Sequence, residues 1–84
     1  MLRKRPTADE IIAEAEKIGW VRRPGLGQFV LQHPGAGLFV ILQPIPPGTR
    51  YASAVAASYA RVLGLKMEGT TDPTKWTPTE DEET

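Results

Sequence analysis

The stretch that decides the fold is "QFVLQHPGAGLFVIL", residues 28–42, in which two short apolar runs flank a turn. Both runs are rich in β-branched and aromatic residues, and the "PGAG" between them is typical of a turn, so the stretch predicts a β-hairpin. Side chains alternate along a strand, so Phe29, Leu31 and His33 share a face that we expect to pack against helices. The open face then carries Gln28, Val30 and Gln32.

The second run of this hairpin is apolar on both of its faces. If helices cover only one face of the sheet, Phe39 and Ile41 are left exposed to water beside Val30. An exposed apolar patch of this kind indicates a partner surface, a self-association surface or a covering segment. The alternative is ordinary packing within the domain.

The segments before the hairpin predict a third strand and a helix. "WVRR", residues 20–23, reads as a short strand, and "PGLG", residues 24–27, as a second turn, which makes a three-stranded antiparallel meander. "PTADEIIAEAEKIG", residues 6–19, predicts an amphipathic helix with a Thr7–Glu10 capping box and Gly19 as its stop. The charged residues of this helix are expected to face water, namely Glu10, Glu14, Glu16 and Lys17.

A second helix is predicted after the prolines of "QPIPPG", from Arg50 to Leu63. Thr49 is expected to cap its start, and Gly64 to end it. The fold class is therefore α+β, in the order α-β-β-β-α, with a three-stranded antiparallel meander and two helices on one face.

The ends of the chain differ in composition from the middle. We expect a basic arm over residues 1–6, the folded domain over 7–66 and an acidic Thr/Pro-rich disordered tail over 67–84. Before Glu68 nine basic residues oppose four acidic ones, a net charge of +5, and from Glu68 onward one lysine opposes six acids, a net of −5. This asymmetry suggests a nucleic-acid surface with a competing acidic tail, or a tail that only keeps the chain in solution.

Composition excludes several classes of function. The chain has no cysteine, which excludes disulfides and thiolate metal sites, and we expect neither a metal nor a cofactor. The longest strongly apolar run, residues 37–42, is far shorter than a membrane span, so a cytoplasmic protein without membrane contact is expected. "GLG" at residues 25–27 lacks the context of a nucleotide-binding loop and reads as a hairpin turn.

From Ala8 to Leu65 the chain resembles the HicA toxins, small mRNA interferases of toxin–antitoxin systems. The resemblance rests on five stretches in order: "IGWVRR" at 18–23, "FVLQHPG" at 29–35, "VILQP" at 40–44, "PGTR" at 47–50 and "RVLGL" at 61–65. It implies a fold like that of the double-stranded-RNA-binding domain. Members of the family carry "GSHH" before the second strand, and Gln28 stands at the position of the catalytic histidine.

These observations lead to three hypotheses for function. The first is a non-catalytic nucleic-acid-binding module, with RNA more probable than DNA as its ligand, because a glutamine amide cannot exchange protons as a catalytic histidine does. Its expected contact residues are Arg22, Arg23, Gln28 and Arg50. The second is a protein-binding or dimeric module that regulates or inhibits, through Val30, Phe39, Ile41 and Trp76. The third is a weak ribonuclease, although no catalytic residue is assigned.

Overall fold

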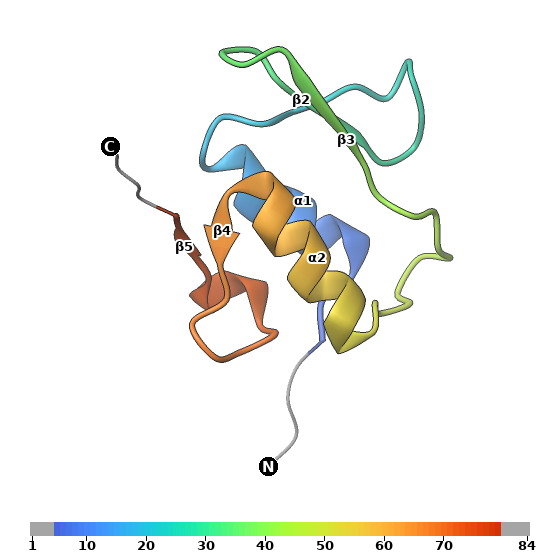
Figure 1. Ribbon diagram of the computed structural model, residues 1–84. Helices are drawn as coiled ribbons and strands as arrows, with labels where there is room; N and C mark the ends of the chain where they lie inside the picture. The colour runs from blue at the N-terminus through green and yellow to red at the C-terminus, as the bar shows by residue number, and fades with distance from the viewer. Residues whose placement is uncertain (1–4, 80–84) are drawn as a thin grey trace.

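The computed structural model describes residues 5–79. Their elements follow in the order α1 (Ala8–Glu16), β1 (Val21–Arg22), β2 (Val30–His33), β3 (Leu38–Ile41), α2 (Ser53–Leu63), β4 (Leu65–Lys66), the 3-10 helix η1 (Pro73–Lys75) and β5 (Thr77–Pro78). The α+β class, the three-stranded antiparallel sheet and the two helices are confirmed. In Figure 1 the two helices lie between the β2–β3 hairpin on one side and the β4–β5 pair on the other.

The meander forms with the expected faces. The strand order is β1-β2-β3, and Leu31 pairs with Arg22 on one side and with Val40 on the other. Leu31 is fully buried and Phe29 is 8% exposed, in one core cluster with residues of both helices. Both helices therefore lie on the Leu31 side of the sheet, and the opposite side, here called the outer face, is turned away from them.

Helix α1 begins as its sequence predicts. Thr7 is the N-cap and forms the capping box with Glu10, and Ile11, Ile12 and Ala15 are buried. One expectation for this helix is wrong, because Glu14 is buried and not solvated. Its carboxylate lies 3.0 Å from the ammonium of Lys17, and this ion pair compensates part of the cost of burying the charge.

Helix α2 begins three residues later than expected. Its N-cap is Ala52, which makes no side-chain capping bond, so the predicted Thr49 cap is wrong. Arg50 forms a β-bridge with Thr7, and the Tyr51 amide donates to the Pro6 carbonyl at 2.9 Å, so the backbone here is already used in extended pairing. The end of α2 is as predicted, with Gly64 in the left-handed conformation.

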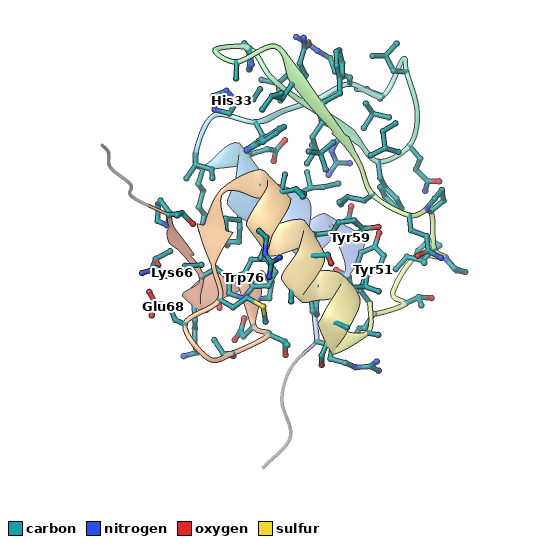
Figure 2. The ribbon with its side chains drawn as sticks, viewed as in Figure 1. His33, Tyr51, Tyr59, Lys66, Glu68 and Trp76 are labelled. Atoms are coloured by element: carbon teal, nitrogen blue, oxygen red, sulfur yellow. The ribbon has the colours of Figure 1, made fainter. Side chains whose placement is uncertain are left out.

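The expectation of a disordered segment from residue 67 is wrong for residues 67–79. Strands β4 and β5 pair, and the Thr79 amide donates to the Gly64 carbonyl at 2.8 Å. Trp76 is only 5% exposed, belongs to the main core and donates from its indole N–H to the Thr70 carbonyl at 2.9 Å (Figure 2). Trp76 therefore serves the fold and does not lie on an exposed partner surface. The basic residues up to 4 and the acidic residues 80–84 lie outside the described part.

Candidate partner-binding surface

The outer face of the sheet is partly apolar and partly covered. Phe39 is 51% exposed and Ile41 68% exposed, as the alternation predicts. Val30 pairs with Ile41 but is only 5% exposed, so the expectation that it is open to solvent is wrong. The turn between β1 and β2 covers it: a Cβ placed on Gly27 would lie 2.8 Å from the Val30 Cγ2. The two most exposed large apolar side chains of the outer face, Phe39 and Ile41, thus lie on β3.

Strand β3 is also an edge of the sheet. Its neighbour on one side is β2, and no strand among residues 5–79 pairs with its other side. The Leu42 amide donates to the Phe29 carbonyl at 2.9 Å, and hydrogen-bonded and non-hydrogen-bonded residues alternate along an antiparallel pair. By this alternation the backbone N–H and C=O groups of Val40 point toward β2, and those of Phe39 and Ile41 point away from the sheet.

Strand β3 lacks the charged side chains and the proline that commonly protect an edge strand. Natural edge strands are commonly protected by charged side chains, by proline or by a covering element. No charged residue occurs between His33 and Arg50, and no proline occurs within β3. Within residues 5–79, Phe39 and Ile41 thus combine unpaired outward backbone groups with exposed apolar side chains, and we call these two residues the β3 edge.

The end of β3 is held by a pair of tyrosines. The Tyr51 hydroxyl donates to the Gln43 carbonyl at 2.6 Å, and the Tyr59 hydroxyl accepts from the Gln43 amide at 2.7 Å. The two rings pack edge to face with centroids 5.2 Å apart (Figure 2). Burial, and secondarily the nearby Tyr59, raises the pKa of Tyr51 to about 12. The tyrosines thus satisfy the backbone N–H and C=O of Gln43, which is the next residue after Ile41 whose backbone groups point away from β2.

The tyrosine pair borders the candidate surface, and the sequence pattern did not indicate it. Tyr51 and Tyr59 are eight residues apart, further than the three or four residues that make helix side chains neighbours, so helical spacing does not predict their contact. Their contact with Gln43 depends on the path of the proline-rich segment between β3 and α2. No local signal in the sequence encodes that path.

The arginines expected to bind nucleic acid are separated into two groups. Arg22 lies 3.5 Å from the Asp9 carboxylate and Arg50 lies 3.3 Å from that of Glu10, so both reach the first turn of α1. Arg50 also donates to the Arg5 carbonyl. Because Arg50 is outside α2, the expectation that it stands at the start of that helix is wrong.

Arg23 and Gln28 lie on either side of the turn between β1 and β2, and both are exposed. The Arg23 Nε donates to the Gln32 side-chain oxygen at 2.8 Å. Gln32 pairs with Phe39, so it lies on the outer face. Among residues 5–79, Arg23 and Gln28 have no carboxylate partner, unlike Arg22 and Arg50. Both lie at the turn that joins β1 to β2, across β2 from β3.

His33, the histidine of the chain, packs on the helix side of the sheet. Its ring lies edge to face against Trp20 with centroids 5.2 Å apart, and its Nδ1 is buried and has no hydrogen-bond partner within residues 5–79. Figure 2 shows it at the hairpin end of the sheet. This environment is typical of a packing histidine. Among residues 5–79 no group of three His, Asp or Glu side chains is placed to hold a metal ion.

A shallow groove of about 490 Å³ runs between α2 and β4, away from the β3 edge. Arg61 and Lys66 supply its charged groups, and small residues including Ala57, Ala60 and Gly64 supply much of its wall. Among residues 5–79 its lining includes neither a carboxylate nor an imidazole. In the described part of the chain no helix is long and apolar enough to cross a membrane.

The comparisons with known proteins leave the family open. The chain matches no protein-family model, no curated protein and no solved structure.

Proposed function

We propose that this chain is a small non-catalytic protein-binding module of the cytoplasm, which accepts an extended strand of a protein partner along the β3 edge. The observation that carries the proposal is the coincidence, on Phe39 and Ile41, of unpaired backbone groups and exposed apolar side chains. Strand addition to a sheet edge derives its affinity from main-chain hydrogen bonds and its specificity from alternate side chains. Both components are available at this edge.

The partner strand is expected to be apolar and uncharged. The β3 edge offers no charge for a basic or acidic segment, because the chain has no charged residue between His33 and Arg50. Side chains of an added strand would lie next to Phe39 and Ile41 on the outer face, where aromatic and β-branched neighbours stabilise cross-strand pairs. Arg23 lies on the same face but on the β1 side of the sheet, so β2 and β3 separate it from an added strand.

Amide hydrogen exchange with a synthetic strand tests this proposal. The probe is a peptide copying residues 37–43, extended by a short lysine tag for solubility. Its addition is expected to slow exchange of the Phe39 and Ile41 amides by at least about tenfold, because new hydrogen bonds form there. A control peptide with proline at the positions of Phe39 and Ile41 should give no protection. The chain is diluted until these amides exchange independently of its concentration, and unchanged exchange under saturating peptide then contradicts the function.

RNA binding is the second candidate, favoured by the exposure of Arg23 and Gln28 beside the same turn. It predicts that a single-stranded RNA binds with an affinity that falls steeply with salt, since phosphate contacts release counterions. Arg23→Ala should weaken binding more than Arg22→Ala, because the Arg22 guanidinium is already paired with Asp9. Fluorescence anisotropy at two salt concentrations measures both effects. Equal losses in the two variants, or salt-independent binding, would count against this candidate.

We also propose that the scaffold is HicA-like, with a dsRBD-like fold and without ribonuclease activity. Support comes from the order α1, β1, β2, β3, α2 and from the motifs between Ala8 and Leu65. Gln28 is exposed just before β2, where the family carries its catalytic histidine. The wild-type chain should therefore leave RNA intact at neutral pH, and Gln28→His should introduce cleavage. Cleavage by the wild type would overturn the non-catalytic assignment.

A further inference from the structure

We infer that the strand accepted at the β3 edge is β3 of a second copy of this chain, in an antiparallel pair related by a two-fold axis at Val40. The inference rests on the proposed function and specifies its partner. In this arrangement the two three-stranded sheets join into one sheet of six strands, and the unprotected edge of each copy is removed.

The free backbone groups of β3 match those of an antiparallel copy. Phe39 and Ile41 each present one outward N–H and one outward C=O, and they are two residues apart. If Phe39 lies opposite Ile41 of the copy, these two residues form a hydrogen-bonded pair, in which each N–H donates to the C=O of the other. By symmetry the reciprocal pair is identical, so all four outward groups of each chain find partners.

The tyrosine pair sets the length of this ladder. The backbone groups of Gln43 point away from β2, as those of Phe39 and Ile41 do. The Gln43 N–H is already bonded to the Tyr59 hydroxyl, and its C=O to the Tyr51 hydroxyl. Pro44 follows and has no N–H to donate. At the other end, the Gly37 amide bonds to the His33 carbonyl within the hairpin turn. The available ladder is therefore short and centred on Val40, a position that makes it self-complementary.

The charge of the chain favours a second copy over a charged partner. Two β3 strands approach without opposing like charges, since residues 34–49 contain no charged side chain. The whole chain has a formal net charge of zero at pH 7, so two copies experience no net repulsion. The symmetric register also places Phe39 beside Ile41 of the copy on the outer face, an aromatic and β-branched cross-strand pair of the favoured kind.

Sedimentation equilibrium on two matched variants tests the inference. Ile41→Ser and Ile41→Pro both remove the isoleucine side chain, but only proline also removes the outward N–H, which no group within residues 5–79 accepts. The wild-type chain, 9.2 kDa as a monomer, should reach twice that mass at high micromolar concentration. Ile41→Ser should remain a dimer with a Kd raised by at most about tenfold, whereas Ile41→Pro should be monomeric.

Circular dichroism and thermal melting establish that both variants fold. If Ile41→Pro does not fold, exchange of the Phe39 and Ile41 amides in the wild-type chain is followed on dilution instead. Protection that disappears on dilution supports the dimer. A wild-type monomer at all concentrations, or equal loss of the dimer in both variants, overturns the inference. If the chain is a monomer and the β3 peptide still protects the Phe39 and Ile41 amides, the dimer is contradicted and the proposed function is supported. If the chain is a monomer and the peptide gives no protection, the dimer and the proposed function are both contradicted.

Discussion

Gly27 lies where the turn between β1 and β2 passes over Val30. A Cβ at this position would lie 2.8 Å from the Val30 Cγ2, closer than two carbon atoms pack, and Val30 is 5% exposed and has little room to move. Gly27→Ala is therefore expected to lower the free energy of unfolding by about 1–3 kcal/mol. Gly25, in the same turn, has open space around its Cα, so Gly25→Ala is the matched control.

Urea denaturation followed by tryptophan fluorescence measures both glycine variants. The free energy of unfolding of Gly25→Ala, obtained from its urea midpoint, should lie within about 0.5 kcal/mol of the wild-type value. Equal stability of the two variants would mean that the turn moves away from Val30 without cost. Val30 would then be covered only loosely, and the exposed part of the outer face would extend beyond β3.

Tyr51 makes the stability of the fold sensitive to alkaline pH. Its pKa is raised from 10 in the unfolded chain to about 12 in the folded one, so the folded state retains the hydroxyl proton that the unfolded state loses. The stabilisation is complete below pH 10 and is lost as the pH rises from 10 to 12, at up to roughly 1.4 kcal/mol per pH unit. Melting temperatures across this range should fall accordingly.

Tyr51→Phe provides the comparison for the alkaline effect. It removes the hydrogen bond to the Gln43 carbonyl, so it should be about 1 kcal/mol less stable than the wild type at pH 8. It also removes the titrating group, so its stability should decline less between pH 10 and 12. Parallel declines in the two proteins would show that another group is responsible.

At the scale of elements, the segment containing β4, η1 and β5 depends on Trp76. The indole is in the main core and hydrogen-bonded to the Thr70 carbonyl, and η1 packs against α1. Trp76→Ala should cost about 3–5 kcal/mol, a large fraction of the stability of a small domain. Residues 67–79 should then become accessible, and trypsin should cleave faster after Lys66 and Lys75.

Val62→Ala is the control for this truncation. Val62 is on α2 but is 54% exposed, so its loss should change the unfolding free energy by less than about 0.5 kcal/mol and leave cleavage unchanged. Thermal melting and timed trypsin digestion provide the two readouts. If Trp76→Ala melts and digests as Val62→Ala does, the segment does not depend on the indole.

At the scale of the whole molecule, the inferred dimer and the RNA candidate differ in their response to salt. The β3 edge is uncharged and the chain has no net charge, so the dimer Kd should change by less than about twofold between 50 and 500 mM NaCl. Binding of RNA through arginines would weaken by orders of magnitude over the same range. Sedimentation equilibrium in the two buffers measures the first effect. Strong salt dependence of the dimer would indicate an interface elsewhere.

The sequence by itself determined the features that act over a few residues. Thr7 and Glu10 are three residues apart and cap α1 wherever the helix lies, and Gly64 ends α2 because it adopts the left-handed backbone at little cost. Alternation along a strand was enough to place Leu31 in the core and Phe39 and Ile41 on the outer face. The exposed side chains of the candidate surface were therefore predictable, and a three-stranded meander places its third strand at an edge. The bonds of Tyr51 and Tyr59 to the Gln43 backbone were not predictable.

Only the tertiary structure decided which long-range contacts override these local signals. Trp76 lies in a segment with the composition of a disordered tail, yet the core has room for its ring and the Thr70 carbonyl accepts its N–H. Thr49 has the chemistry of a helix cap, but the pairing of Arg50 with Thr7 holds the chain extended. Such contacts depend on how distant segments approach each other, and neither composition nor periodicity records that distance.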